Sequence, residues 1–216
     1  MSSENFDVIV VGAGPAGVAA AKASAATGAK TLLLEKNPVI MALKPCGQAV
    51  SSHTLRTAEL KPEPPLVVNK VRALVYAPNG KAVKLNDMGF LINKTVLLQE
   101  IAAQAASLGA EIHVNEAFLD LTRKNDSILV KTTRGEYSAS VVIGADGYNS
   151  KVARVLGVSE RSEPIPTLQY VMAGCEPEIV DAIRIYLGNE IAPKGYAWIF
   201  PISDRIMEVG LGVRGC

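Results

Sequence analysis

The sequence predicts an α/β fold, in which a doubly wound parallel sheet with an inserted β-meander leads into the start of an antiparallel sheet. Residues 6–11 are a short apolar run rich in β-branched residues, typical of a buried parallel strand. Residues 93–108 place apolar side chains at spacings of three and four, and a strand pattern follows at 111–115. After residue 159, strand patterns follow one another without a helical pattern between them, which predicts a second, sheet-based domain.

A glycine-rich turn joins the first strand to the first helix. Gly12 allows the tight turn, Gly14 lets a pyrophosphate approach the backbone, and Gly17 lets the helix pack closely on the strand. Pro15 suits the first helical turn because its missing N–H has no intrahelical partner there. The free N–H groups and the positive dipole end of this helix favour a phosphate.

A second strand at 31–34 ends in an acid. Glu35 follows Gly17 by 18 residues, where a carboxylate can accept both ribose hydroxyls of an adenosine. An ordinary strand-to-helix turn is the alternative interpretation of the glycines alone. The strand before, the helix after, the second strand and the terminal acid together favour a dinucleotide site.

The remaining elements follow in chain order. A short helix is expected at 52–60, a long helix at 93–108 and a third helix at 151–156. Strands are expected at 66–68, 71–76, 82–85, 111–115, 117–123, 127–133, 136–140, 141–144, 167–175, 182–187, 196–201 and 206–213. This order assigns residues 1–65 and 90–158 to a nucleotide-binding domain, and residues 66–89 and 159–216 to a partial substrate domain.

Composition excludes several classes of protein. The 216 residues are 49% hydrophobic and 20% charged with a net charge of +1, which fits a globular chain and gives no electrostatic case for nucleic acid. No apolar run reaches the ~20 residues of a membrane span, so any membrane contact is expected to be peripheral. Cys46, Cys175 and Cys216 are widely spaced without a C-x-x-C pair, so we expect no disulfide framework, no metal site and a cytoplasmic location.

Four stretches in order resemble one family. They are Gly12–Gly17 with Glu35, the loop Lys44-Pro-Cys-Gly47, the turn Gly144-Ala-Asp-Gly147 with Ser150, and the strand Tyr196-Ala-Trp-Ile-Phe-Pro201. The set is similar to the geranylgeranyl reductase family, within the flavoproteins folded like para-hydroxybenzoate hydroxylase. The resemblance implies that the cofactor is FAD.

The resemblance also implies the site residues. The expected cofactor-binding residues are Gly12, Gly14, Pro15, Ala16, Gly17, Glu35, Lys36, Cys46, Gly47, Ala49, Lys94, Ala117, Asp146 and Gly147. Cys46 is the catalytic candidate, in a loop beside the flavin, where packing or positioning ranks slightly above proton donation. Lys44 could lower the pKa of the Cys46 thiol if it lies close.

Two of these stretches carry a simpler alternative. Asp146 can cap the following helix, or it can accept from a ribityl hydroxyl or from backbone near the pyrophosphate. The alternating side chains of Tyr196, Trp198 and Phe200 face one side of the sheet, where such a stripe is usually plain core. The resemblance implies instead that they line a long apolar substrate cavity. His53 and His113 are expected to be ordinary polar residues.

Three departures from the family pattern stand out. Gln48 occupies the place of a second glycine after Cys-Gly, and Lys94 replaces an arginine that reaches back to FAD. Lysine keeps the charge but loses the bidentate geometry. The family's downstream Gly-Asp motif does not follow residue 210, so we expect a fragment, a truncated gene product, or half of a protein that another chain completes. The strand edge left open favours pairing with that chain or self-association.

The leading function is FAD-dependent reduction of carbon–carbon double bonds in isoprenoid chains. The expected partners are a prenyl-chain small molecule or lipid and an electron donor, either NAD(P)H or ferredoxin. An aromatic monooxygenase or halogenase of the same fold is one alternative, and a non-catalytic FAD-binding fragment is another. The cysteine loop and the Tyr-x-Trp-x-Phe-Pro strand argue against the former, whereas the missing Gly-Asp motif supports the latter.

Overall fold

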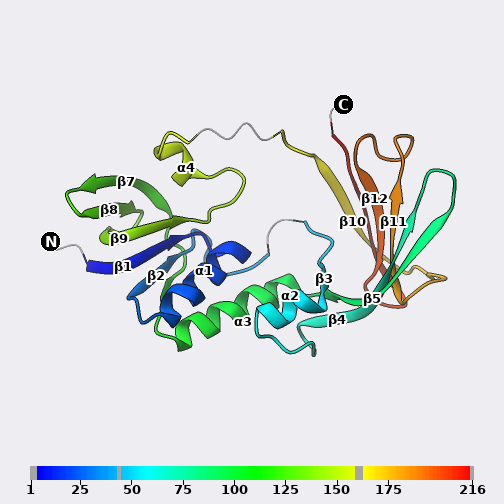
Figure 1. The fold of residues 1–216 in the computed structure, drawn as a ribbon, viewed down its shortest axis with the longest axis horizontal. Helices are drawn as coiled ribbons and strands as arrows, with labels where there is room; N and C mark the ends of the chain where they lie inside the picture. The colour runs from blue at the N-terminus through cyan, green and yellow to red at the C-terminus, as the bar shows by residue number, and fades with distance from the viewer. Residues whose placement is uncertain (1–3, 43–44, 159–162, 215–216) are drawn as a thin grey trace. The chain divides into compact units, whose positions relative to one another are not determined.

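A six-stranded sheet carries the glycine-rich turn in the computed structural model, which describes residues 4–42, 45–158 and 163–214 (Figure 1). Its strands, in the spatial order β6-β2-β1-β9-β8-β7, are β6 (Glu111–His113), β2 (Thr31–Leu34), β1 (Glu4–Val11), β9 (Glu136–Gly144), β8 (Ser127–Thr132) and β7 (Phe118–Lys124). The first four run parallel, whereas β8 is antiparallel to both of its neighbours.

The meander joins the parallel part of this sheet through one long strand. The sequence predicted two strands, at 136–140 and 141–144, but β9 runs through both. Its partner on one side is β8 and on the other β1, with Val11 opposite Gly144. The meander therefore delivers the chain directly to the edge where the glycine-rich turn begins.

Three helices accompany this sheet: α1 (Pro15–Ala26), α3 (Lys94–Ser107) and α4 (Lys151–Val155). The predicted apolar stripe of α3 is buried at Leu97, Leu98, Ile101, Ala102 and Ala105. Its last predicted member, Leu108, follows the end of the helix and is exposed. The core of the sheet is built from residues of β1, β2, the meander and α4, namely Phe6, Ile9, Val11, Leu32, Leu34, Phe118, Val130, Ala139 and Val152. None of the helices in the described ranges has the length and apolar character of a membrane span.

A seven-stranded sheet forms the second part, in the order β10-β13-β12-β11-β4-β5-β3. Its elements are β3 (Ala49–Ser51), α2 (Ser52–Thr57), β4 (Val67–Tyr76), β5 (Ala82–Ile92), β10 (Thr167–Ala173), β11 (Ala182–Leu187), β12 (Tyr196–Pro201) and β13 (Ile206–Gly212). All neighbours are antiparallel except β11 and β4, which are parallel. The predicted fold class, a parallel α/β sheet followed by an antiparallel sheet, is confirmed.

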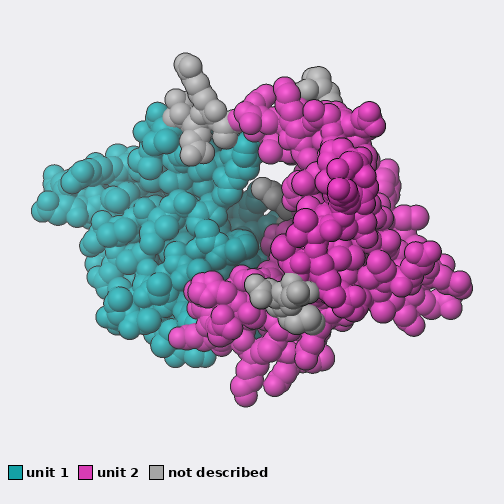
Figure 2. Space-filling view, turned by 45° about the vertical axis from the view of Figure 1, so that its right-hand side comes forward, with its two compact units in different colours: residues 1–42, 95–161 teal, residues 43–94, 162–216 magenta. Residues whose placement is uncertain are grey.

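Two compact units result, residues 1–42 with 95–161 and residues 43–94 with 162–216 (Figure 2). The sequence-based division assigned residues 43–65 and 90–94 to the first domain, whereas both ranges belong to the second unit, in which β3 pairs with β5. The predicted strands also differ from the structure at β4. This strand runs without a break through the two strands predicted at 66–68 and 71–76, and its pairing with β5 has register shifts at two places. The helix predicted at 52–60 is shorter, since α2 ends at Thr57 and Glu59 has a φ of +57°.

Candidate functional site

The three motif glycines have different surroundings at the end of β1. A Cβ on Gly17 would lie 1.7 Å from the Gly12 carbonyl oxygen, and a Cβ on Gly12 would lie 2.7 Å from the carbonyl oxygen of Ala145. Gly12 also has a φ of +99°, which disfavours any other residue. A Cβ on Gly14 would meet nothing within 4 Å. Gly12 and Gly17 therefore serve close packing, and Gly14 leaves open space beside the backbone.

The first turn of α1 presents its backbone donors without a side-chain cap. The N-cap residue is Gly14, which has no side chain that could accept a hydrogen bond from the helix N–H groups. Pro15 and Ala16 are exposed in the turn that follows. The first N–H groups of a helix have no intrahelical partners, and they form the positive end of its dipole. The arrangement suits a phosphate placed over Gly14.

Glu35 is buried at the end of β2 and ties the glycine turn to the next loop. Its Oε2 accepts from the backbone N–H of Ala13 at 2.9 Å. Its Oε1 accepts from the backbone N–H of Asn37 at 2.9 Å and from the Asn37 amide at 2.5 Å. A carboxylate oxygen offers two lone pairs, so Oε2 keeps capacity for a further donor. This leaves room for one ribose hydroxyl, where the sequence predicted two.

Two further predicted cofactor residues, Lys36 and Ala117, lie close to Glu35, one next to it in the sequence and one through the neighbouring residue Glu116. Lys36 is exposed. The Ala117 N–H donates to the Thr133 hydroxyl at 3.1 Å, and the Ala117 carbonyl accepts from the Thr133 N–H at 3.0 Å. The preceding residue, Glu116, donates its N–H to the Glu35 carbonyl oxygen at 2.9 Å. The segment before Ala117 therefore lies alongside the end of β2, next to the predicted ribose site.

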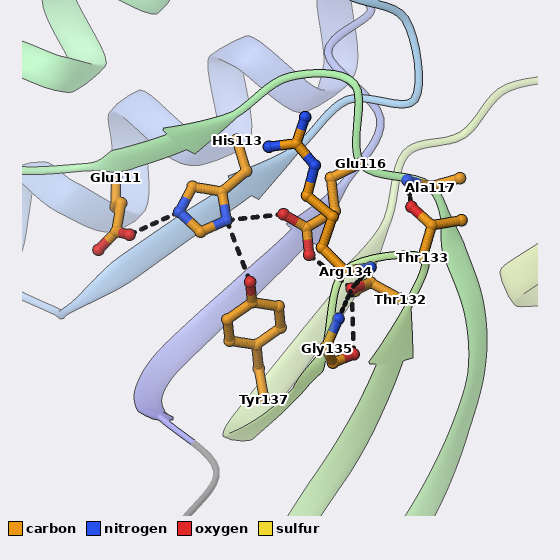
Figure 3. A network of polar contacts seen from close by, with 9 residues as sticks. All are labelled: Glu111, His113, Glu116, Ala117, Thr132, Thr133, Arg134, Gly135 and Tyr137. Carbon is orange, nitrogen blue, oxygen red and sulfur yellow. Dashed lines mark hydrogen bonds and ion pairs between the residues drawn. The ribbon is translucent and has the colours of Figure 1, made fainter.

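A polar network supports that segment (Figure 3). His113 lies between two carboxylates, with Nε2 2.6 Å from Glu111 and Nδ1 2.9 Å from the buried Glu116 (Figure 3). The Thr132 hydroxyl donates to Glu116 at 2.5 Å. Burial, followed by the hydrogen bond and charge of Glu116, raises the pKa of Tyr137 to about 12, so the phenol stays protonated at neutral pH. The sequence missed these partners of His113, although Glu111 and Glu116 lie within three residues of it.

Asp146 caps α4, as the simpler sequence interpretation proposed. Its carboxylate accepts from the Ser150 hydroxyl at 2.6 Å and from the backbone N–H groups of Lys151 at 2.5 Å and Val152 at 3.2 Å. Burial raises the pKa of the Asp146 carboxyl, but these hydrogen bonds outweigh it and the pKa lies below its ordinary value. Gly147 follows with a φ of +83°. Because β1 and β9 end side by side, Asp146 lies against Gly12.

The cysteine loop lies in the second unit and packs on the aromatic strand. Cys46 is exposed, and Lys44 lies outside the described residues. A Cβ on Gly47 would lie 2.4 Å from the Phe200 ring, so the Gly47 backbone rests directly on that ring. Ala49, also exposed, begins β3. The structure thus brings together two motifs that are about 150 residues apart in the sequence.

Gln48 and Lys94, which both depart from the family pattern, are joined by a hydrogen bond. Gln48 has a φ of +55°, in the left-handed region where glycine is favoured. Its side-chain Oε1 accepts from the backbone N–H of Lys94 at 3.0 Å, at the start of α3. The half-buried side chain of Lys94 makes no contribution to this bond.

Tyr196, Trp198 and Phe200 share one face of β12. The Tyr196 and Trp198 ring centroids are 5.8 Å apart, and those of Trp198 and Phe200 are 6.3 Å apart. Trp198 and Phe200 are buried and form a cluster with Val71 and Leu91, whereas Tyr196 is 48% exposed. Two of the three side chains therefore serve as core, and Tyr196 is the one open to a ligand.

Glu208 was missed by the sequence analysis. It lies on β13 opposite Phe200 and is 1% exposed. Burial raises the pKa of the Glu208 carboxyl above its ordinary value, although hydrogen bonds from Trp198 and Gln48 oppose the shift. The signal was present in the sequence, because Glu208 is the one charged residue of the apolar run 206–213.

The predicted residues thus form two groups, one in each unit. In the first unit, the glycine turn, Glu35 and Asp146 meet where β1, β2 and β9 end. In the second unit, Gly47 of the cysteine loop lies against Phe200 of the aromatic strand, and Gln48 and Trp198 lie beside Glu208. Among the described residues, no group of three or more His, Cys, Asp or Glu side chains could hold a metal ion.

Comparison with known proteins identifies the first group. The family model of FAD dependent oxidoreductases matches residues 7–162, which is most of the chain. The chain belongs to the FAD dependent oxidoreductase family. Its cofactor is accordingly FAD, and the residues present fit that group. The open space beside the Gly14 backbone and the uncapped start of α1 suit a pyrophosphate. The buried carboxylate of Glu35 suits the ribose.

A second match places this flavoprotein near the reductases. The model of the geranylgeranyl reductase catalytic domain matches residues 164–216. A digeranylgeranylglycerophospholipid reductase of Methanopyrus kandleri is 36% identical over 97% of this chain and 55% of that protein. The enzyme of the same name from Methanocaldococcus jannaschii is also 36% identical, over 97% of this chain and 56% of that protein. The chain therefore spans about half the length of the curated relatives it matches.

Solved structures agree with the fold of this flavoprotein. A geranylgeranyl bacteriochlorophyll reductase-like protein of Thermoplasma acidophilum superposes with a TM-score of 0.88 at 32% identity, over 99% of this chain and 57% of that chain. The myxobacterial chondrochloren halogenase superposes with a TM-score of 0.76 at 18% identity, over 98% of this chain and 53% of that chain. The second likeness shows the shared fold alone. The predicted resemblance to geranylgeranyl reductases is confirmed.

Proposed function

We propose that this chain carries the FAD site and part of the substrate site of an enzyme that reduces carbon–carbon double bonds in geranylgeranyl-type chains of lipids. The match of residues 164–216 to the geranylgeranyl reductase catalytic domain carries the proposal. The relatives named as digeranylgeranylglycerophospholipid reductases support the same substrate class. The proposal extends to an electron donor, NAD(P)H or ferredoxin, and to peripheral contact with the membrane that holds the lipid.

Roles follow for the residues of the first unit. When bound, FAD supplies the hydride that adds to one carbon of the double bond, and a proton completes the addition at the other carbon. The backbone around Gly14, Pro15, Ala16 and Gly17 binds the pyrophosphate, and Glu35 accepts from the ribose. Asp146 holds the start of α4 in place through Oδ2 and keeps acceptor capacity on Oδ1.

The second unit supplies the substrate-facing residues. The exposed Cys46 contacts substrate or flavin. The half-exposed Tyr196 contacts substrate and extends the apolar surface of β12. Trp198 and Phe200 support that surface from within the core, and Gly47 lies on the Phe200 ring. Apolar surroundings suit a prenyl chain and exclude water from the reacting carbons.

A single-turnover experiment tests this function. The chain is loaded with FAD, reduced without oxygen, and mixed with a geranylgeranyl lipid or with its fully saturated counterpart. We expect the flavin to be reoxidised by the unsaturated lipid only, with a product that has one double bond fewer. Reoxidation by neither lipid, or hydroxylation or halogenation of an aromatic compound when oxygen is admitted, would contradict the proposal. Flavin bleaching by NADPH or by reduced ferredoxin, compared side by side, identifies the electron donor.

A further inference from the structure

The buried carboxylate of Glu208 connects the aromatic strand with the cysteine loop inside the second unit. The indole Nε1 of Trp198 donates to Glu208 Oε1 at 3.3 Å. The side-chain amide of Gln48 lies near the same carboxylate, close enough for its polar interaction to lower the pKa of Glu208. Glu208 is 1% exposed, so these donors replace the water that a carboxylate would otherwise bind.

Gln48 holds the loop through its side chain and its backbone carbonyl. Its side-chain oxygen accepts from the backbone N–H of Lys94, which leaves the NH₂ group to donate to Glu208. Its backbone carbonyl accepts from the Ile92 N–H at 3.0 Å. The φ of +55° at Gln48 is a backbone conformation that residues other than glycine rarely adopt. These hydrogen bonds stabilise that conformation, and with it the direction in which residues 45–47 lead into β3.

A second contact, between Gly47 and Phe200, also holds the cysteine loop. Gly47 rests on the Phe200 ring, and Phe200 lies directly opposite Glu208 in the β12–β13 ladder. Trp198 lies opposite Gly210, where a Cβ would be only 2.3 Å from the indole ring. The indole is therefore confined between the backbone of β13 and the Glu208 carboxylate, and its position is linked to that of the loop.

We propose that Glu208 is a positioning residue: through Gln48 it fixes the cysteine loop, residues 45–48, and through Trp198 it fixes the aromatic strand, so that Cys46 and Tyr196 keep one geometry toward the substrate. The inference rests on the proposed reductase function for its role in turnover. A carboxylate is suited to this task because it accepts on both oxygens. A glutamine at the same place would offer one oxygen and would turn an NH₂ group toward the NH₂ group of Gln48.

Exchanging the two side chains provides the test. Glu208→Gln sets donor against donor, and Gln48→Glu sets carboxylate against carboxylate. The double variant restores the pairing, because Gln at 208 can accept from Trp198 and donate to Glu at 48, which still accepts from the Lys94 N–H. All variants are made with Cys175 and Cys216 replaced by serine, and Glu190→Gln, at an exposed site, is the matched control.

Two measurements follow the loop and the strand without substrate. The alkylation rate of Cys46 reports the loop, and the emission of Trp198, the only tryptophan of the chain, reports the strand. We expect Glu208→Gln to raise the alkylation rate about fivefold and to shift the emission, with the double variant returning both to within about twofold of wild type. Gln48→Gly, which keeps the loop conformation without the link, should raise the alkylation rate while leaving the melting temperature nearly unchanged.

The outcomes separate this inference from the proposed function. Alkylation and emission unchanged in Glu208→Gln, or effects of the two single variants that simply add in the double variant, would overturn the positioning role. In the single-turnover assay, Glu208→Gln should slow prenyl reduction with FAD affinity unchanged, and the double variant should recover it. If the wild-type chain fails to reduce any prenyl lipid, the reductase function fails, while rescue of alkylation and emission by the double variant still establishes the link.

Discussion

The backbone of Gly17 lies directly against the carbonyl oxygen of Gly12, so that a single methyl group on Gly17 would overlap that oxygen at 1.7 Å. The overlapping atom belongs to the backbone of the β1–α1 turn, which cannot move aside as a side chain can. We therefore expect Gly17→Ala to lower the free energy of unfolding by about 3 kcal/mol. Gly14→Ala, where the added atom meets nothing within 4 Å, should change it by less than about 0.5 kcal/mol. Urea unfolding measures both, and equal stabilities of the two variants would contradict the packing role of Gly17.

Glu35 is expected to contribute to both stability and cofactor binding. Glu35→Ala leaves the N–H of Ala13 and the amide of Asn37 without their buried acceptor, so the free energy of unfolding should fall by about 1–3 kcal/mol. FAD affinity should fall as well, because the ribose loses an acceptor. Glu100→Ala, at an exposed position of α3, serves as the control. A Glu35→Ala chain that unfolds and binds FAD like this control would show that Glu35 has neither role.

Asp146 should make stability depend on pH in the acid range. Its folded-state pKa is depressed, because the hydrogen bonds from Ser150, Val152 and Lys151 outweigh burial. Its contribution to stability is therefore present above the ordinary aspartate pKa and is lost as the pH falls through the depressed value. We expect Asp146→Asn to be less stable than wild type near neutral pH and to approach it in acid. Urea unfolding from about pH 7 to about pH 3 checks this, and an unchanged difference between the two across that range would argue against it.

Cys46 is expected to act in turnover and not in FAD binding. Cys46→Ser is nearly isosteric, and the side chain is exposed in the loop that rests on Phe200. The variant should therefore bind FAD like wild type and reduce a prenyl lipid more slowly in a single turnover. Cys175→Ser is the matched control, since Cys175 lies outside this loop. Equal rates for wild type and both variants would leave Cys46 without a role in the reaction.

Much of the first unit could be predicted from the sequence, because its signals are local. The glycine spacing, the strand before it and Glu35 after the next strand each follow from backbone geometry within about 30 residues. The long helix was predicted almost to the residue, from an apolar stripe that the structure buries. The break predicted within β9 was wrong, since pattern alone does not show that the last meander strand also pairs with β1.

The second unit was harder to predict because its contacts join distant residues. Nothing near Gln48 indicates that its partner is Glu208, and the pairing of β3 with β5 depends on the whole sheet. The aromatic alternation on β12 correctly predicted one shared face. It did not predict that Trp198 and Phe200 pack into the core while Tyr196 stays exposed, because that depends on Val71 and Leu91 from other strands.

Titration of the chain with FAD, compared between wild type and Gly14→Val, tests the central claim most directly. Gly14 borders open space, so the valine should leave the fold intact while occupying the place where a pyrophosphate meets the backbone. We expect wild type to bind one FAD per chain and Gly14→Val to bind it at least about tenfold more weakly, with similar unfolding curves. A wild-type chain that binds no FAD, or a Gly14→Val chain that binds it equally well, would contradict the assignment of the glycine turn as the cofactor site.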